Sequence, residues 1–243
     1  MLNFVDEYSG MVWIYPLKKK SDTFVLFQEW KALVENETGK HVKVFRTDNG
    51  GEYTSESFPQ YLHNKGINHQ TTTPHTSPET GKSEHLHRTI MNHARAICSD
   101  SKLPPNMWGE AVKATGYLKN HMPTRTLADK TPFEMWYGRR PDVSHLRKLG
   151  CKVWVHIPGE NPKIYNRSVE CVLVGYLDNS KAYCCLNWSS GRIHITCNTF
   201  FIESQDLKDR ILHPGLTVGE MVGETDVIQD ENIEKTLKNI EKH

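Results

Sequence analysis

The sequence has no long hydrophobic run, and its apolar stretches are only a few residues each. A membrane-spanning helix needs roughly 18 or more apolar residues in succession, so the sequence predicts no span and no membrane partner. The first residues, MLNFVDEYSG, also lack the basic segment and apolar core of a secretory signal peptide. We therefore expect an intracellular protein, in the nucleus or the cytoplasm.

Paired cysteines are absent as well. The six cysteines form no Cys-x-x-Cys pair, and none of the 13 histidines combines with them at zinc-finger spacing. Free cysteines are usually buried. We expect these cysteines to be reduced and mostly buried, and we expect no structural zinc.

The net charge of +1 conceals an uneven distribution along the chain. Residues 1–202 contain 25 basic and 19 acidic residues, whereas residues 203–243 contain five basic and ten acidic residues. A mildly basic body with an acidic end is compatible with a polyanionic partner. Apolar density drops after residue 203, so we expect 204–243 to form a flexible acidic tail with a marginal helix near its end.

Strand-like and helix-like patterns alternate through the first 140 residues. Apolar, β-rich runs predict strands at 2–8, 11–17, 41–47 and 67–73. Apolar residues at 3.6-residue spacing predict helices at 21–37, 57–64, 83–99, 107–120 and 133–137. The Pro- and Gly-containing stretch 74–82 is expected to be a loop. This alternation predicts an α/β layer fold.

After Pro141 the pattern changes to four short β-like runs at 151–158, 170–176, 182–188 and 192–202. The turn signals PGENP, LDNS and SSG separate them, which predicts a small antiparallel barrel or sandwich. We therefore expect three parts: 1–141, 142–203 and the tail 204–243. The tryptophans in apolar patterns, Trp108, Trp136 and Trp154, are predicted to be core residues.

Two acids stand at positions where chemistry is plausible. Asp48 follows the apolar run ending at Thr47, and Glu84 opens the predicted helix 83–99, with 35 residues between the two acids. Carboxylates brought together in this way can hold Mg²⁺, which prefers oxygen ligands. The alternative is purely structural, because Asp-Asn-Gly-Gly is also a common turn and an acid is favoured near a helix start.

The surroundings of the two acids resemble the retroviral-type integrase core, and most closely its copia-type retrotransposon branch. The motifs that carry the resemblance are TDNGGEYTS, TGKSEHLHRTI, FVDEYSGMVWIYPLKKKSD, KALVENETGKHVKVFRTDNGGEY, LPPNMWGEAVKATGYLKNHMPT, KTPFEMWYGRRPDVSHLRKLGCKVWVHIP and ECVLVGY. They are colinear over residues 2–203. The resemblance implies an RNase H-like core, a D,D-35-E triad and a following Src-homology-3-like barrel. It makes Asp48 the second acid and Glu84 the third, holding Mg²⁺ or Mn²⁺.

The resemblance leaves the first acid unassigned. In the family that Asp lies on a strand preceding the one that FVDEYS resembles, and the zinc-binding module comes earlier still. We therefore expect an amino-terminally truncated core whose first strand is missing. The first strand present should then lie at a sheet edge, or another segment should complete the sheet. Asp6 is the candidate surrogate for the first acid. Its alternative role is to close the strand through local hydrogen bonds at the turn.

The basic residues that the resemblance places near DNA are fewer than the family pattern provides. His85 and Leu86 follow Glu84 where basic residues are usual, although Arg88 keeps its place one turn on. Phosphate neutralisation dominates DNA affinity, so we expect weak, salt-sensitive binding. The candidate DNA contacts are Lys82, Arg88, Arg139, Arg140, Arg147 and Lys148; the last four cluster where the two predicted domains join.

Two functional interpretations follow. In the first, the chain is an integrase fragment whose ancestral reaction is metal-dependent 3′-processing and strand transfer. Its expected partners are element ends and target DNA, and a homo-oligomer is compatible with this interpretation. With two acids of three, we expect little or no turnover and weak or absent metal binding. In the second, it is a domesticated, non-catalytic DNA- or protein-binding module, or a decayed remnant of the element.

Overall fold

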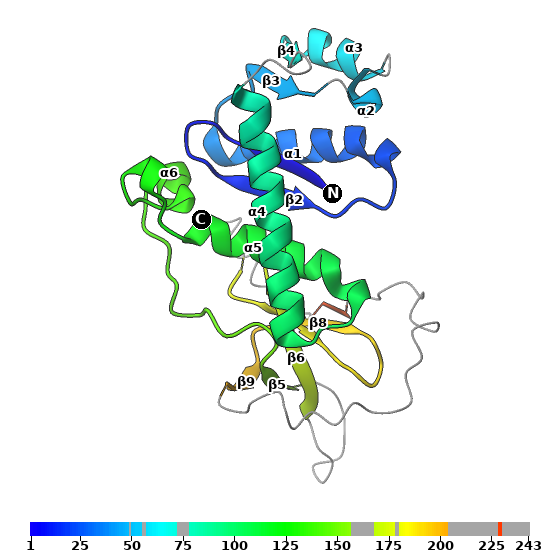
Figure 1. Cartoon of the computed structure of the whole chain (residues 1–243), viewed down its shortest axis with the longest axis vertical. Coiled ribbons are helices and arrows are strands. Elements are labelled where there is room, and N and C mark those ends of the chain that lie inside the picture. The colour runs from blue at the N-terminus through cyan, green and yellow to red at the C-terminus, as the bar shows by residue number, and fades with distance from the viewer. Residues whose placement is uncertain are drawn as a thin grey trace. The chain divides into compact units, whose positions relative to one another are not determined.

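The computed structural model describes residues 1–48, 50–54, 57–71, 78–156, 168–177, 180–203 and 228–229 (Figure 1). These residues form two compact units. The first comprises 1–5 and 13–92, and the second comprises 6–12 and 93–243. No helix in the described part of the chain combines the length and the apolar character that crossing a bilayer requires.

The first unit contains two separate strand pairs. Strand β1 (Leu2–Val5) pairs with β2 (Val12–Tyr15), and β3 (Val44–Thr47) runs parallel to β4 (Asn68–Thr71), with Val44 opposite Asn68. Within the described residues β1 has β2 as its only sheet partner. The expected edge position of the first strand is therefore confirmed.

Helix α1 (Thr23–Thr38) holds both strand pairs through aromatic side chains. Phe27 on α1 is 0% exposed, and its ring centroid lies 6.1 Å from that of Phe4 on β1 and 4.4 Å from that of Phe45 on β3. Phe58 of helix α3 (Ser57–Asn64) lies 5.0 Å from the same ring. Stacked and tilted aromatic pairs of this kind stabilise a core beyond the area they bury. Helix α1 therefore packs against both β1 and β3.

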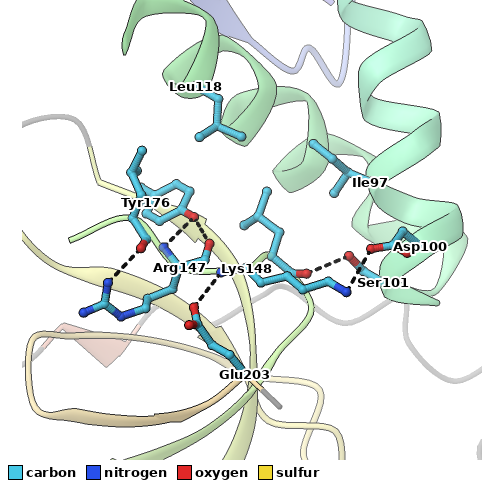
Figure 2. Close-up of a pocket in the computed structure, with 10 residues that line it drawn as sticks. Ile97, Asp100, Ser101, Leu118, Arg147, Lys148, Tyr176 and Glu203 are labelled. Atoms are coloured by element: carbon cyan, nitrogen blue, oxygen red, sulfur yellow. Dashed lines mark hydrogen bonds and ion pairs between the residues drawn. The ribbon is translucent and has the colours of Figure 1, made fainter. Parts of the chain in front are cut away.

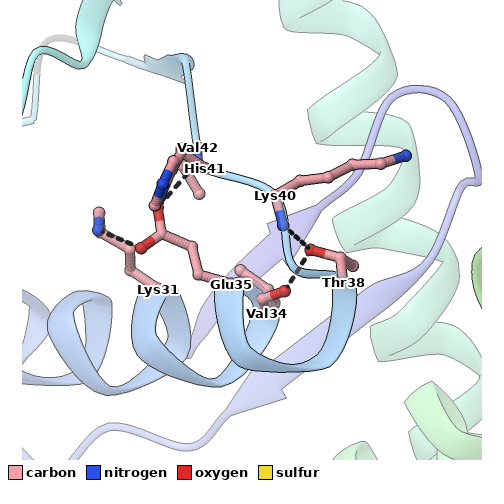
Figure 3. A network of polar contacts seen from close by, with 7 residues as sticks. All are labelled: Lys31, Val34, Glu35, Thr38, Lys40, His41 and Val42. Carbon is pink, nitrogen blue, oxygen red and sulfur yellow. Dashed lines mark hydrogen bonds and ion pairs between the residues drawn. The ribbon is translucent and has the colours of Figure 1, made fainter.

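A polar network fixes the chain between α1 and β3 (Figure 3). Glu35 accepts a hydrogen bond from the Val42 amide at 2.9 Å and pairs with the Lys31 ammonium at 2.6 Å. Gly39 ends α1 in the left-handed conformation, at φ +64°, which glycine adopts without steric cost. The start of β3, and hence the position of Asp48 after it, follows from these contacts.

The second unit is built on a six-stranded sheet with the order β10-β8-β7-β6-β5-β9. Helix α5 (Trp108–His121) packs against β6, where Ala114 and Tyr117 join the buried cluster of Cys171 and Leu173. The strands are β5 (Lys152–His156), β6 (Ser168–Tyr176), β7 (Tyr183–Leu186), β8 (Ile193–Thr196), β9 (Thr199–Ile202) and β10 (Ile228–Gln229).

The remaining elements are short, apart from one long helix. Helix α4 (Pro78–Ser101) is the longest of the described elements and contributes residues to both units. The others are η1 (Lys20–Asp22), α2 (Gly51–Thr54), η2 (Pro105–Met107), η3 (Arg125–Leu127) and α6 (Pro132–Tyr137).

Several local expectations were wrong. Helix α4 begins at Pro78 rather than at residue 83, because a proline at the first helical position lacks only an N–H that would have no partner there. The predicted strand 192–202 is two strands, since β8 pairs with β7 while β9 pairs with β5. Residues 228–229 of the predicted flexible tail form a strand parallel to β8. The predicted marginal helix lies outside the described residues.

The predicted core role of the tryptophans was also wrong. Trp108 is 43% exposed, and Trp136 and Trp154 are only partly buried. The cysteines behave closer to expectation. All six are free thiols and four are buried, with Cys98 partly buried and Cys197 exposed.

Gly150 provides a test of how the carboxyl end of α4 meets the sheet. Its φ is +81°, and an added Cβ would lie 2.4 Å from the Cβ and 2.8 Å from the Cα of Ser101. Gly150→Ala should therefore lower the free energy of unfolding by roughly 3 kcal/mol or more, from backbone strain plus overpacking. Gly39→Ala, at φ +64° with open space around it, should lose only about 1–2 kcal/mol. Equal losses in urea unfolding would contradict this packing.

Candidate acid site and basic surface

Asp48 stands directly after β3, and its side chain is exposed. Its Oδ1 accepts a hydrogen bond from the Gly50 amide at 3.1 Å, which is the local turn that aspartate readily forms. Helix α2 begins one residue later, at Gly51. The hydrogen bond between Asp48 and Gly50 is the one expected for the predicted turn. Asn49, between them, lies outside the described residues. The turn uses one oxygen of the carboxylate and leaves the other exposed.

A second acid lies over the same turn. A Cβ at Gly50 would lie 3.0 Å from Asp48 Oδ1 and 3.0 Å from the carboxyl carbon of Glu52, so both carboxylates converge on this glycine. Lys20 approaches Glu52 at 4.0 Å. Sequence reasoning gave Glu52 no role. The available signal was its place in the first turn of a helix that starts at Gly51, three residues after Asp48.

The negative charges of the acid turn affect the pKa of Tyr53. Burial raises the pKa of Tyr53 to about 12, and the neighbouring carboxylates Asp48 and Glu52 add to the increase. The Tyr53 ring also contacts Phe45 and Phe58, at centroid distances of 6.2 Å and 5.5 Å. The acid turn is thus anchored on the aromatic core of the first unit.

His69 supports the end of β3 from the neighbouring strand. Its Nε2 lies 2.8 Å from the hydroxyl of Thr47, the residue before Asp48. Burial lowers the pKa of His69 below its ordinary value of 6.5. The ring is therefore neutral in the folded protein near neutral pH and forms a neutral hydrogen bond with Thr47.

Glu84 lies on the exposed side of α4, within the first unit. The helix begins at Pro78, so Glu84 stands in its second turn and not in the first turn that the sequence predicted. The helix dipole acts mainly within the first turn, so it contributes less to this carboxylate than expected. Arg88 is exposed one turn further on, and residues four apart share a helix face.

Asp6 has a structural role in the turn between β1 and β2. Its Oδ2 accepts hydrogen bonds from the Ser9 amide at 2.8 Å and from the Ser9 hydroxyl at 2.7 Å. Its backbone amide donates to the Met11 carbonyl at 3.0 Å. These contacts match the local hydrogen-bonding alternative that the sequence left open for Asp6.

The predicted basic cluster is largely engaged with neighbouring groups. The Arg147 guanidinium donates to the carbonyls of Ser144 and Leu146 and lies 5.7 Å from the centre of the Phe201 ring. The Arg140 side chain is 90% exposed, with Glu134 at 3.8 Å. Arg139 lies 5.8 Å from the centre of the Phe133 ring. Lys82 is in α4, but its side chain lies outside the described residues.

Lys148 lines a pocket of about 380 Å³ in the second unit (Figure 2). Its ammonium lies 3.5 Å from Asp100, and its backbone amide donates to Glu203 at 3.0 Å. The Tyr176 hydroxyl donates to the Arg147 carbonyl, and burial raises the pKa of Tyr176 to about 12. The polar groups at the rim therefore bond to one another, over apolar walls formed by Ile97, Leu118, Leu146 and Leu149.

The two acids predicted as metal ligands, Asp48 and Glu84, offer carboxylate oxygens. No group of three or more His, Cys, Asp or Glu side chains is gathered as a metal site in the part of the chain that the structure describes. Asp48 and Glu84 are both exposed and belong to the same unit. Exposed carboxylates of this kind suit a hard, hydrated cation such as Mg²⁺ better than a soft metal.

Comparison with protein-family models gives two matches. Residues 1–77 match the integrase core domain, and residues 151–214 match the retroviral polymerase SH3-like domain. The first match contains β1, α1, β3 and Asp48, and the second contains β5 to β9.

Curated relatives cover most of this chain. A retrovirus-related Pol polyprotein from transposon TNT 1-94 of Nicotiana tabacum is 40% identical over 75% of the chain. The corresponding polyprotein from transposon RE1 of Arabidopsis thaliana is 34% identical over 83% of the chain. In each case the chain spans 14% of the length of the polyprotein.

Among solved structures, the chain is similar to one in the simian T-cell lymphotropic virus intasome in complex with the PP2A regulatory subunit B56 gamma. The identity is 20%, the TM-score is 0.47, and the match covers 76% of this chain and 69% of the other.

The depressed pKa of His69 predicts a pH effect on the strand pair that carries Asp48. Below about pH 6.5 the unfolded chain takes up a proton at this ring more readily than the folded chain, so stability falls as pH falls. His69→Gln should remove this contribution. Because the ring is partly exposed, we expect the change from about pH 7.5 to about pH 5.5 to be smaller in the variant by only a few tenths of a kcal/mol. Urea unfolding at the two pH values measures it; an unchanged pH dependence would contradict the assignment.

Proposed function

Because this chain belongs to the copia-type retrotransposon Pol polyproteins and contains an integrase core domain followed by a retroviral SH3-like domain, we propose that it acts on DNA in metal-dependent integration. The observation that supports this most directly is the position of Asp48. It lies at the carboxyl end of β3, inside the match to the integrase core, and one of its oxygens is free of the turn's hydrogen bond.

Asp48 and Glu84 are the two carboxylates that would hold Mg²⁺ or Mn²⁺. Such an ion, when bound, supplies charge stabilisation to a phosphodiester undergoing attack by water or by a DNA 3′-hydroxyl. The chain itself contributes positioning. The β3 turn holds Asp48, and α4 carries Glu84 with Arg88 on the same face, where a guanidinium can contact a phosphate next to the acid.

Element ends and target DNA are the proposed partners, and self-association is part of the same proposal. Arg88 and Arg140, both exposed, are proposed phosphate contacts. Two of the family's three acids are assigned, so we expect slow or undetectable turnover by this chain alone. The non-catalytic binding module is the competing proposal, and DNA binding without Asp48-dependent joining is its signature.

The acid pair is tested by replacing each carboxylate with its amide. Asp48→Asn and Glu84→Gln should each abolish the slow joining of an element-end duplex to plasmid DNA that the unaltered chain shows, since each removes a charge that holds the metal. The same variants should weaken Mn²⁺ binding measured by electron paramagnetic resonance. The matched control is Glu29→Gln, because Glu29 is an exposed acid on α1.

Three outcomes decide between the two functions. Joining or Mn²⁺ binding that falls in both acid variants and persists in the control supports the integration chemistry. DNA binding that is retained by Asp48→Asn, with no joining and no Mn²⁺ binding in any form, supports the binding module. Joining at the wild-type rate in Asp48→Asn contradicts the proposed role of this acid.

Two arginines of the basic cluster should separate DNA contact from stability. Arg140→Ala should weaken duplex binding severalfold and reduce its salt slope by about one, with little change in unfolding free energy, because its side chain is exposed. Arg147→Ala should instead cost about 1–2 kcal/mol of stability, because it removes hydrogen bonds to two carbonyls and the Phe201 contact. Fluorescence anisotropy and urea unfolding of both variants measure the difference, and the reverse pattern would exchange the two roles.

A further inference from the structure

The outer face of β5 carries an aromatic side chain that the sequence placed in the core. Val153 and Val155 point inward and are buried at 0% and 2% exposure. The alternate residues Lys152, Trp154 and His156 are less buried and share the other face, as expected for the two-residue period of a strand. Trp154 therefore lies on the surface side of the sheet.

Trp154 has an aromatic neighbour across the strand pair. In the antiparallel register of β5 and β9, Trp154 lies opposite Phe200. Directly opposed residues have Cβ atoms roughly 4.5–5.5 Å apart, so the two side chains are neighbours on one face of the sheet. Phe200 is 68% exposed, so most of its surface is not used for packing within the chain. Strand β9 is also the last in the sheet order of the described residues, so this aromatic pair lies at a border.

Charged groups surround the pair in a specific order. The Lys152 ammonium lies 5.1 Å from the centre of the Trp154 ring and 2.7 Å from Glu170. Glu170 is opposite Trp154 on β6, so the row across three strands reads Phe200, Trp154, Glu170. The pair thus has one exposed ring, that of Phe200, and a cation that lies over the Trp154 ring and pairs with Glu170.

We propose that Trp154 and Phe200 form a stacking platform for the unpaired bases of single-stranded nucleic acid. Exposed aromatic rings beside a cation are the combination by which proteins bind single strands without sequence preference, because every base has a stacking face. A duplex conceals those faces within its own stack and presents only base edges and backbone. The platform is therefore selective for strand ends and overhangs.

The charge of the platform favours a nucleic acid over an apolar protein segment. Lys152 provides a cation within reach of a backbone phosphate, and His156 lies on the same face of the strand. An apolar partner would leave the Lys152–Glu170 pair desolvated without a new hydrogen bond, which is costly. A strand keeps its phosphates and the ion pair in water while its bases cover the rings.

This inference deepens the proposed function, since it adds a subsite for exposed nucleotides to an integrase-related chain. It fails separately from that proposal, because the platform residues lie in the second unit whereas Asp48 and Glu84 lie in the first. Asp48→Asn should leave single-strand binding unchanged, and loss of the platform does not remove either carboxylate.

The probes are three fluorescein-labelled oligonucleotides: a thymidine dodecamer, an abasic dodecamer of the same backbone charge, and a duplex of equal length. With the full chain, Phe200→Ala should weaken binding of the thymidine strand roughly tenfold and leave abasic and duplex binding unchanged. The slope of affinity against salt should stay the same, because no phosphate contact is removed.

Matched variants distinguish stacking from general apolarity. Phe200→Leu keeps an apolar side chain but no aromatic face, so it should lose as much affinity as Phe200→Ala. Phe200→Trp should retain or increase affinity. Glu170→Gln should strengthen binding, because it removes a negative charge and releases Lys152. Tyr8→Ala, at an aromatic residue 75% exposed elsewhere in the second unit, is the control for loss of a surface ring.

Other results would overturn the proposal. Equal weakening of the thymidine and abasic strands by Phe200→Ala would show that the bases are not read by stacking. Full retention by Phe200→Leu would indicate an apolar protein contact instead. Concentration-dependent association in sedimentation that Phe200→Ala abolishes, without any effect on oligonucleotides, would assign the surface to a second copy of the chain.

Discussion

The first unit depends on aromatic packing against one helix. Strand pairs β1–β2 and β3–β4 share no sheet in the described residues, so no ladder of backbone hydrogen bonds joins them. The rings of Phe4 and Phe45 instead meet on Phe27 of α1, which is fully buried. Phe45 lies three residues before Asp48, and its ring also contacts Tyr53 beyond the turn. The packing of these aromatic side chains against α1 therefore helps to position the acid turn, in addition to the pairing of β3 with β4.

The acid turn combines a rigid base with a hydrated carboxylate. A Cβ at Gly50 would lie 3.0 Å from the carboxylates of both Asp48 and Glu52, so a side chain there would require both carboxylates to shift by a few tenths of an ångström. Burial and these two charges raise the pKa of Tyr53 to about 12. Asp48 and Glu84 are both exposed to solvent.

The second unit divides its basic and aromatic residues between internal support and surface recognition. Arg147 and Lys148 tie the segment before β5 to Phe201, Asp100 and Glu203, so their charges are partly used inside the fold. The Arg140 side chain remains exposed to solvent, and so does the ring of Phe200 on β9. Phosphate contacts supply affinity without selectivity, while a stacking surface distinguishes unpaired from paired strands. Phosphate contacts depend on salt concentration more strongly than stacking contacts do, so binding measured at several salt concentrations can separate the two.

Local patterns in the sequence determined much of this protein. The 3.6-residue spacing of apolar residues placed α1 and α3, the family motifs placed Asp48 at the end of β3, and the alternation of elements predicted an α/β fold followed by a β region. Tertiary structure decided the rest, because it depends on partners distant in the chain. The run 192–202 divides because its two halves pair with β7 and β5 at different places in the sheet, and Ile228–Gln229 form a strand only because β8 offers an edge. Trp154 lies outside because the register of β5 directs Val153 and Val155 inward. A two-residue period shows that two faces differ, and only packing determines which face is buried.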